Sequence, residues 1–531
     1  MNIILPTGKE KTNSSNTSAR TTTPTTQNPL ITLKTSLPSI TNITKKIIDH
    51  AVHRKIMKTP DHNRKYKSHT QKNSSMVSNK SIVKKSHQSS KSNIGKKIKT
   101  RKPHIYTKHP DYLQKLVNNY YDNDASVKDY LEHAHKKLHI KPSARRVIVI
   151  GDIHGDLDVA IKCLILAKCI QPITPPYHKT IDNMNAFFES LIWTGVDTQI
   201  VQLGDQIDRV RPQSWDRNSL SRTSAYEDEG STLEIFYLFW HLNNLAQKQG
   251  GAVWCIIGNH EIMNIDGDFR YVSTEEFRCF KDHLAHVYYP NSKYPYHSRT
   301  IHNTQKTRKS GRLPIGYRER LYAFSPTGLC ANFIAHNYYS MLQIGNWLFC
   351  HGSPTMEAVQ TYPIDLLNTV ASMYLLGLDS NELNIENHFD KIMKDNDDNQ
   401  SEDSTSIIWS RTFGDQELAL QNTENHEKKQ TIQTQANINE LLDKILTAYN
   451  KKNNNNTNQT KVTHIAIGHT PQFQGSINYG INSICGDRVW RCDIGMSKAF
   501  INGSVKRQRP IQVLEIIAGL APRVLSSYSK K

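Results

Sequence analysis

Short apolar runs separated by clusters of polar residues mark the chain from about residue 145 onward. The runs lie at residues 147–150, 200–203, 253–257, 347–350, 465–467, 489–490 and 513–517. Near-continuous apolar runs of this length are typical of strands that are buried on both faces. The pattern therefore predicts a series of buried strands over most of the chain after residue 145.

Helical patterns lie between these runs. Apolar residues recur at helical spacing over residues 157–167 and again over residues 233–245, before a helix stop at Gly250 and Gly251. The alternation of strand, polar tip, helix and strand predicts a layered α/β fold in which sheets are flanked by helices. Because such strands run in parallel, the polar tips should gather at one edge of the sheets.

Five of the runs end in tips that carry side chains able to bind a metal. The tips are GDIHGD at 151–156, GDQIDR at 204–209, GNHE at 258–261, HG at 351–352 and GHT at 468–470. A single histidine is usually an ordinary polar residue, and most of the 24 histidines have that interpretation. Five such tips in chain order, each after an apolar run, are very hard to produce by chance.

The residue types in these tips indicate which metals they suit. Mixed Asp, Asn and His ligands fit borderline-hard divalent ions such as manganese, iron or zinc, and do not fit thiolate-preferring ions. A carboxylate shared by two ions would hold them roughly 3.5–4 Å apart, which is the geometry of two-metal phosphoryl transfer. In that chemistry a bridging water becomes a hydroxide and attacks phosphorus in line.

The tips resemble the PPP family of metallophosphatases, whose motifs are GDxHG, GDxxDR, GNHE, HG and GH, over residues 146–500. GNHEIMNIDGDFRYV at 258–272, WSR at 409–411 and CDIGMS at 492–497 resemble the Shewanella-like protein phosphatase branch more closely. The resemblance implies a calcineurin-like metallophosphoesterase sandwich that hydrolyses phosphate monoesters.

The resemblance also implies a role for individual residues. It assigns two divalent ions, manganese first and iron or zinc as alternatives, to Asp152, His154, Asp205, Asn259, His351 and His469. Asp205 would bridge the two ions. His260 would be the general acid that protonates the leaving oxygen, with Asp208 orienting it. Arg209 and Arg411 would hold the phosphate through their planar, bidentate guanidinium groups.

Two departures from the family pattern limit what is carried over. The glycine that often follows GDxxDR is Val210, and the segment before GNHE lacks the Leu-Arg of the eukaryotic serine/threonine phosphatases. The second departure argues against the regulatory subunits and toxin sites of that branch. Asp493 and Glu261 are interpreted either as supports of the metal ligands or as ordinary polar packing. A fold that lost its activity, or another arginine in the role of Arg411, remain alternatives.

The phosphatase function itself has competing interpretations. The first is a phosphoprotein phosphatase, acting on phosphoserine and phosphothreonine before phosphotyrosine. A dinucleoside polyphosphate hydrolase of the same superfamily would use the same metals. A third interpretation is a polyanion-binding protein in which phosphatase activity is secondary, since the charge of the chain is unevenly distributed.

All of the excess positive charge lies in the first 110 residues. They contain 23 Lys and Arg against 3 Asp and Glu, while the whole chain has a net charge of +19. This Ser-, Thr-, Asn- and Lys-rich composition predicts a disordered basic arm, because it cannot bury enough apolar surface to offset its conformational entropy. The arm should attract nucleic acids or acidic surfaces. The run KKIKTRK at 96–102 is either a nuclear-import address or part of a solvated linker.

The remaining organisation is inferred from composition. Residues 111–144 are interpreted as a linker or helical lead-in and residues 145–520 as the catalytic domain, with polar loop insertions at 391–405 and 451–460. The start of the chain does not fit a secretory signal, a transit peptide remains open, and no apolar stretch of 18 residues predicts a membrane span. Eight cysteines without a CxxC pair are interpreted as reduced thiols of a cytosolic or nuclear protein, with disulfides or zinc as the alternative.

Removing the arm tests this division of the chain. A chain that starts near residue 110 should stay folded and keep its kcat on a small phosphopeptide, because every candidate catalytic residue lies between Asp152 and His469. The full chain should bind RNA with an affinity that falls steeply with salt, whereas the shortened chain should lose most of that affinity. RNA binding by the full chain that is insensitive to salt would contradict the interpretation.

Overall fold

The structure is a computed structural model of the 531-residue chain. It describes residues 138–171, 181–211, 225–288, 313–377, 385–394, 405–416, 425–453, 460–474, 477–501 and 509–527. The basic arm predicted at residues 1–110, and residues 111–137 of the lead-in predicted at 111–144, lie outside these residues.

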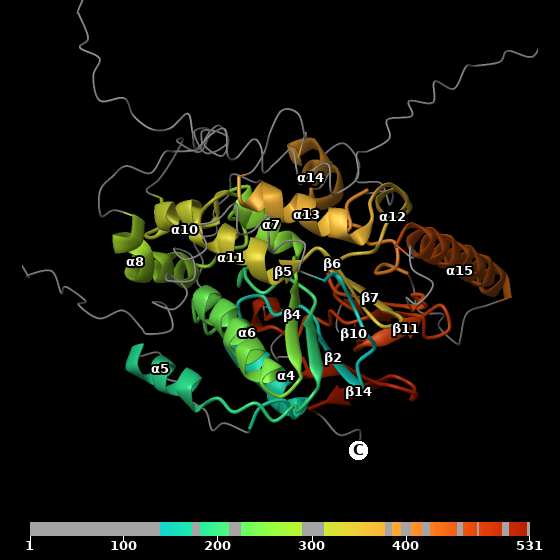
Figure 1. The fold of residues 1–531 in the computed structure, drawn as a ribbon, viewed down its shortest axis with the longest axis horizontal. Helices are drawn as coiled ribbons and strands as arrows, with labels where there is room; N and C mark the ends of the chain where they lie inside the picture. The colour runs from blue at the N-terminus through green and yellow to red at the C-terminus, as the bar shows by residue number, and fades with distance from the viewer. Residues whose placement is uncertain are drawn as a thin grey trace, which may run out of the picture.

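Two six-stranded sheets form the centre of the molecule (Figure 1). The first has the order β14 (Arg523–Ser526), β13 (Gln512–Ile517), β2 (Arg146–Ile150), β3 (Gln199–Gln202), β4 (Ala252–Ile256), β5 (Tyr338–Tyr339). The second has the order β1 (Ile140–Lys141), β6 (Met341–Ile344), β7 (Trp347–Cys350), β8 (His464–Ile467), β12 (Val489–Arg491), β11 (Asn482–Ile484). A separate small hairpin pairs β9 (Phe473–Gln474) with β10 (Ile477–Asn478).

Helices flank both sheets. Those on the first sheet include α4 (Leu157–Leu166), which contacts β13, and α6 (Thr232–Gln247), which packs on β4 (Figure 1). On the side of the second sheet, α13 (Ile364–Leu375) contacts β6. The other helices are α5 (Ile181–Ser190), α7 (Asn259–Ile265), α8 (Thr274–Tyr288), α10 (Tyr317–Phe324), α11 (Leu329–Asn337), α12 (Met356–Thr361), α14 (Ile385–Met393), α15 (Asn425–Asn453) and the 3-10 turn η2 (Lys498–Phe500).

The direction of the strands decides where the functional residues meet. In the first sheet β2, β3, β4 and β5 are parallel, and in the second β7, β8 and β12 are parallel. Parallel strands end at the same edge of a sheet. Within each sheet, the loops that follow these parallel strands therefore lie at one edge: those after β2, β3 and β4 in the first sheet, and those after β7, β8 and β12 in the second.

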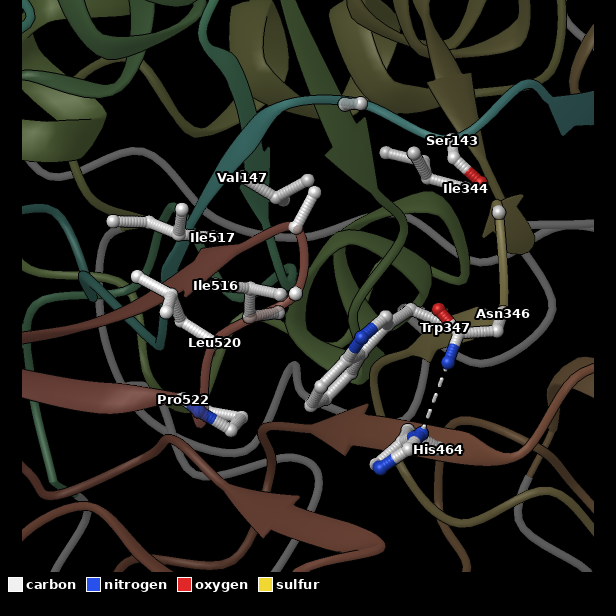
Figure 2. A pocket seen from close by; sticks show the side chains of 14 residues that line it. Ser143, Val147, Ile344, Asn346, Trp347, His464, Ile516, Ile517, Leu520 and Pro522 are labelled. Carbon is white, nitrogen blue, oxygen red and sulfur yellow. Dashed lines mark hydrogen bonds between the residues drawn. The ribbon is translucent and has the colours of Figure 1, made fainter.

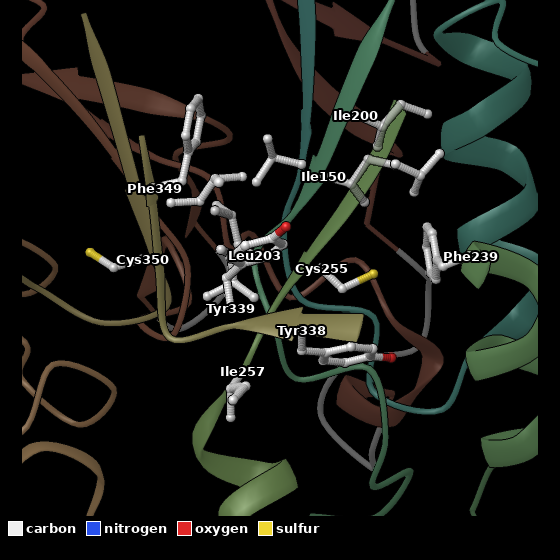
Figure 3. Packing of buried hydrophobic residues seen from close by; sticks show 14 of the residues in the cluster. Ile150, Ile200, Leu203, Phe239, Cys255, Ile257, Tyr338, Tyr339, Phe349 and Cys350 are labelled. Atoms are coloured by element: carbon white, nitrogen blue, oxygen red, sulfur yellow. The ribbon is translucent and has the colours of Figure 1, made fainter. Parts of the chain in front are cut away.

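One hydrophobic cluster joins the two sheets. Figure 3 shows residues of the first sheet, such as Ile150 and Ile200, and residues of the second, such as Phe349, within this cluster. All three are completely buried. Burying an aliphatic or aromatic side chain of this size stabilises the fold by about 1.5–3 kcal/mol. The shared core fixes the two sheets to each other, and with them the loops at their ends.

The predicted α/β sandwich is confirmed, and each of the seven apolar runs contributes to a strand. The two predicted helices are α4 and α6. The sheets extend beyond the predicted boundaries of 145–520, because β1 and β14 pair within them. The loops predicted at 391–405 and 451–460 begin later than expected, since α14 and α15 continue to residues 393 and 453. Most of each remaining stretch lies outside the described residues.

The remaining expectations concern cysteines and membranes. None of the eight cysteines, all of which lie among the described residues, forms a disulfide, as the sequence predicted, and six of them are buried. Across the described ranges, we find no helix whose length and apolar character would let it cross a bilayer.

The Glu515 carboxylate ties β13 to its two neighbouring strands, and its contacts predict a pH-dependent contribution to stability. It accepts a hydrogen bond from Arg146 Nε of β2 at 2.7 Å and another from Arg523 of β14. Burial alone would raise the pKa of Glu515, but these hydrogen bonds outweigh it and hold the pKa below its ordinary value of 4.5. Its stabilising contribution is therefore complete above that value and is lost as the pH falls through the lowered pKa.

Glu515→Gln should accordingly reduce the free energy of unfolding at neutral pH by about 1.5–3 kcal/mol, the usual range for hydrogen bonds to charged groups. The difference from wild type should shrink below pH 4.5, where the wild-type carboxylate becomes protonated. The free energies of unfolding of both proteins, measured by denaturant unfolding after chelator treatment across this pH range, check the prediction. Glu440→Gln, which removes an exposed ion pair with Lys444, is the control. A difference that persists unchanged at about pH 3 would contradict the prediction.

Candidate active site

The carboxyl ends of five parallel strands bring the sequence-predicted residues together. Asp152 and His154 come after β2, Asp205 and Asp208 after β3, and Asn259 and His260 start α7 after β4; His351 comes after β7 and His469 after β8. None of these residues is more than 6% exposed. Residues as far apart in the sequence as Asp152 and His469, which are separated by 317 positions, thus share one buried polar site.

The backbone turns sharply where these residues sit. His154, Asp205, Asp208 and His469 have φ values of 48°, 51°, 74° and 66°. Non-glycine residues in this left-handed region are uncommon and cluster at functional sites, because the surrounding structure must hold them there. Gly204 has a φ of 96°, which also lies in the left-handed region. A side chain there would in addition clash, since a Cβ would come within 2.7 Å of the Gly258 backbone.

One group of ligand atoms converges on the Asn259 side chain. Its Oδ1 lies 2.9 Å from His351 Nε2 and 2.9 Å from His469 Nδ1. His351 Nε2 is also 3.3 Å from Asp205 Oδ1. Asp205, His351 and His469 place one donor atom each within 4.8 Å of one another, which is a geometry that could hold a metal ion.

The hydrogen bonds on the far side of both imidazoles fit this role. His351 Nδ1 donates to the Leu203 carbonyl at 2.7 Å, and His469 Nε2 donates to the Trp409 carbonyl at 3.1 Å. In the neutral form of each ring these bonds leave the nitrogen that faces Asn259 and Asp205 unprotonated, as in metal-binding histidines. Burial lowers the pKa of His351, but the charge of Asp205 outweighs it and leaves the pKa raised. Burial lowers the pKa of His469 well below its usual range, which favours the neutral form that a cation requires.

A second group of ligand atoms lies on the other side of Asp205. His154 Nε2 is 4.0 Å from both Asp152 Oδ2 and Asp205 Oδ2. His260 Nε2 is 3.7 Å from the same Asp205 oxygen, and His154, Asp205 and His260 form the second cluster with metal-binding geometry. Asp205 thus belongs to both clusters, as the prediction of a bridging carboxylate requires. Asp152 stands beside the second cluster and accepts a hydrogen bond from the His469 backbone N–H at 3.1 Å.

The electrostatics of the site call for positive charge. Asp152 and Asp205 are buried together with Asp493, whose Oδ2 has no hydrogen-bond partner among the described residues. Burial, followed by the charges of Asp493 and Asp205, raises the pKa of Asp152 well above its usual range. Burial of several carboxylates without counter-charge is costly. The donor set and its excess of negative charge therefore fit divalent cations.

His260 is held by a carboxylate as a general acid would be. Its Nδ1 lies 2.8 Å from Asp208 Oδ2, and Asp208 also accepts from Asn264 Nδ2 at 2.9 Å and Arg320 Nη2 at 3.2 Å. Burial lowers the pKa of His260, but the charges of Asp205 and Asp208 outweigh it and leave the pKa raised. A raised pKa keeps a proton on the imidazole near neutral pH.

Two buried glutamates hold the loop after β3 in place. Glu261 accepts backbone hydrogen bonds from Asp205 at 3.0 Å, Gln206 at 2.9 Å and Gly258 at 2.7 Å. Glu276 accepts from the backbone of Asp208 at 3.0 Å and of Arg209 at 2.9 Å. Glu261 is thus a support of the ligand loops, which was one of its two interpretations. No sequence pattern pointed to Glu276 or Arg320, since nothing around them distinguishes them from surface polar residues, and Asn264 lies within the 258–272 motif but was given no role.

The two arginines predicted to hold phosphate differ in their surroundings. Arg411 is exposed, and its charge contributes to lowering the pKa of His469, so it stands at the rim of the site. The Arg209 guanidinium is fully buried, and its Nη1 donates to Asp156 Oδ2 at 2.8 Å and to Ser497 Oγ at 3.0 Å. These contacts disfavour the role predicted for Arg209, because both of its Nη groups are already bound to protein acceptors, while its buried Nε has no hydrogen-bond partner among the described residues.

A cavity of about 320 Å³ lies elsewhere in the molecule (Figure 2). Val147, Trp347 and His464, which line it, belong to the amino-terminal ends of β2, β7 and β8. It is therefore at the opposite end of these strands from the candidate active site and contains none of the candidate catalytic residues.

The bridging position of Asp205 leads to a prediction about metal content. Asp205→Asn should lower the bound manganese substantially, since the carboxylate contributes charge to both clusters. Elemental analysis of the dialysed protein, with circular dichroism to verify folding, measures the effect. Asp197→Asn is a matched control, because Asp197 forms an exposed pair with Arg145. A full metal complement in Asp205→Asn would show that this carboxylate is not a ligand.

Comparison with known proteins adds to this geometry. No family model matches the chain. Over 405 residues the chain is 24% identical to Shewanella-like protein phosphatase 2 of Arabidopsis thaliana, covering 72% of this chain and 78% of the relative. It is 25% identical over 394 residues to Shewanella-like protein phosphatase 1 of Plasmodium berghei, covering 74% of this chain and 76% of that relative.

Among solved structures, the cold-active protein-tyrosine phosphatase of a psychrophilic Shewanella species overlaps 73% of this chain and 82% of its own. Its identity is 17% and its TM-score is 0.39, a level that supports no further conclusion. The two curated relatives carry the name that the motifs indicated. The prediction from the motifs is therefore confirmed: this chain resembles the PPP-family metallophosphatases and, among them, the Shewanella-like protein phosphatases.

Proposed function

We propose that this chain is a metal-dependent phosphatase that hydrolyses phosphate monoesters on phosphoproteins. The observation that carries the proposal is the position of Asp205, whose two carboxylate oxygens face two separate clusters of imidazole donors. The histidine–aspartate pair of His260 and Asp208 stands next to that carboxylate. Shared carboxylate, flanking donors and adjacent proton donor are the parts that phosphoryl transfer to water needs.

The residues divide between two cation positions. Asn259, His351 and His469 would hold one cation, Asp152 and His154 the other, and Asp205 both. Bound divalent cations would supply Lewis-acid activation of the phosphate and a water of lowered pKa. The proposal extends to manganese as the first metal expected, with iron or zinc as alternatives, because imidazole, amide and carboxylate donors form a borderline-hard set.

His260 would handle the proton of the leaving group. Asp208 fixes the ring through Nδ1 at 2.8 Å, so that Nε2 faces the site near Asp205. Protonation of the leaving oxygen at Nε2 matters most when that oxygen would otherwise depart as an alkoxide. A site with a built-in acid therefore suits phosphoserine and phosphothreonine better than phosphotyrosine, whose phenolic oxygen is a better leaving group.

A direct assay tests the proposal. The full chain, loaded with manganese, should release inorganic phosphate from a phosphoserine peptide, and a chelator should abolish this turnover. The same preparation should cleave diadenosine tetraphosphate far more slowly. Cleavage of the dinucleotide without phosphate release from any phosphopeptide would replace the proposal by a dinucleoside polyphosphate hydrolase.

The proton-donor role of His260 gives a prediction that depends on the substrate. His260→Asn should lower kcat on an alkyl phosphate by roughly 10²–10⁴, the usual contribution of a positioned general acid. The loss on p-nitrophenyl phosphate should be much smaller, because that leaving group hardly needs a proton. His464→Asn is the control, since His464 stacks on Trp347 at the other end of β8. Equal losses on both substrates would assign His260 a different role.

A further inference from the structure

We propose that Arg211 binds the phosphoryl group of the substrate, a role that the family resemblance would give to Arg209. The inference rests on the proposed function and assigns one of the groups that this site uses to hold its substrate. It is drawn from where the two guanidinium groups lie, from the rings around them and from the residue between them.

Arg209 is committed to the protein interior. Besides Asp156 and Ser497, its guanidinium donates to the carbonyls of Tyr226 at 3.2 Å and Glu227 at 3.3 Å. Asp156 is itself completely buried. Withdrawing Arg209 toward a substrate would break its 2.8 Å ion pair with that carboxylate and leave only Lys498, whose Nζ is 3.8 Å from Asp156 Oδ1, as a charged partner. Breaking a buried ion pair is destabilising. Arg209 therefore forms a structural ion pair with Asp156.

Arg211 lies two residues further on, against two aromatic rings. Its guanidinium carbon is 4.3 Å from the centroid of Phe500 and 5.7 Å from that of Tyr271. Those rings in turn contact the site histidines, with Phe500 5.4 Å from His154 and Tyr271 4.6 Å from His260. The guanidinium thus stands beside the cluster that contains both histidines. Unlike Arg209, which is completely buried, the Arg211 residue is partly exposed.

The charges of the site are consistent with this position. Burial lowers the pKa of Arg211, although the nearby charges of Asp205, Asp208 and Asp493 oppose that effect. The Arg211 charge also adds to the effect of burial in lowering the pKa of His154. The positive charge of Arg211 therefore interacts with the same carboxylates and imidazoles that would surround a bound phosphate.

The hydrogen bonds of Arg211 leave room for a ligand. Toward the described residues, Nη1 donates to the Val210 carbonyl at 3.1 Å and makes a long contact of 3.5 Å with the Asp208 carbonyl. No hydrogen bond from Nε or Nη2 to a described residue is seen. A planar guanidinium that lies against aromatic rings, and whose Nε and Nη2 bind no described residue, suits bidentate binding of phosphate oxygens.

Val210 explains how the arginine reaches this place. It replaces the glycine that often follows GDxxDR, is 5% exposed, and donates its N–H to the Tyr271 carbonyl at 3.0 Å. This bond fixes the backbone beside Arg211 to the segment that carries the Tyr271 ring. Arg411, which influences His469, would contact the substrate from the side of the other cluster. Two arginines would then face the phosphate from both sides of Asp205.

The test compares phosphate binding and turnover in matched variants of the full chain loaded with manganese. Arg211→Gln should raise the Kd for inorganic phosphate by at least about 10-fold and lower kcat/KM on p-nitrophenyl phosphate by roughly 10²–10³. Arg211→Lys should restore only part of each, because charge remains but the fork is lost. Arg488→Gln removes the same charge from an exposed pair with Asp443 and should behave as wild type.

Manganese content and Tm, measured on each variant, separate binding from folding. They should be unchanged in Arg211→Gln, whereas Arg209→Gln should lower Tm. The inference is overturned if folded, metal-loaded Arg211→Gln binds inorganic phosphate like wild type. Failure of the proposed function would appear differently, as a wild-type chain that hydrolyses no phosphomonoester, and the phosphate-binding comparison would still decide the role of Arg211.

Discussion

The candidate site depends on burying the Asp205 carboxylate among donors from both sheets. The strands that carry Asp205 and Asn259 belong to the first sheet, and those that carry His351 and His469 belong to the second. A buried carboxylate is costly unless it is paired. The protein meets part of this requirement with the His260 backbone N–H, which donates to Asp205 Oδ1 at 2.9 Å.

The imidazoles of His351 and His469 each bind a backbone carbonyl with one nitrogen and turn the other nitrogen toward Asn259. A divalent cation would bind those nitrogens and neutralise the remaining negative charge of the site. The stability of the site and its proposed chemistry therefore have the same origin.

Much of the fold could be predicted from the sequence, because a strand buried on both faces leaves a simple pattern. Runs such as residues 147–150 and 253–257 admit few other structures, and each lies in a strand. Short edge strands such as β1 and β14 left no comparable pattern, since two to four half-exposed residues need no continuous apolar run. The 29-residue helix α15 was missed as well. Its first half is largely polar, but in its second half Leu442, Ile445, Leu446 and Tyr449 recur at helical spacing and are buried in the core, so this part of the helix could have been predicted from the sequence.

The candidate metal-binding residues could be predicted from the sequence for a related reason. Each comes directly after an apolar run, and the carboxyl ends of parallel strands meet, so their proximity could be inferred before any coordinates. The direction of a side chain after a tight turn could not be inferred from the sequence in this way. Arg209 and Arg211 differ by two residues, yet one guanidinium is buried against Asp156 and the other lies over Phe500. Only the packed fold shows that Phe500, which is distant in the sequence, lies beside this loop. The roles of the site residues remain predictions that chemistry has to test.

Whether two cations share Asp205 can be seen in crystals of the full chain grown with manganese and measured at a wavelength where manganese scatters anomalously. We expect two anomalous peaks roughly 3.5–4 Å apart, one on each side of the Asp205 carboxylate. One would lie near Asn259, His351 and His469, and the other near Asp152 and His154. A single peak, or manganese bound away from Asp205 in an otherwise folded molecule, would contradict the shared site.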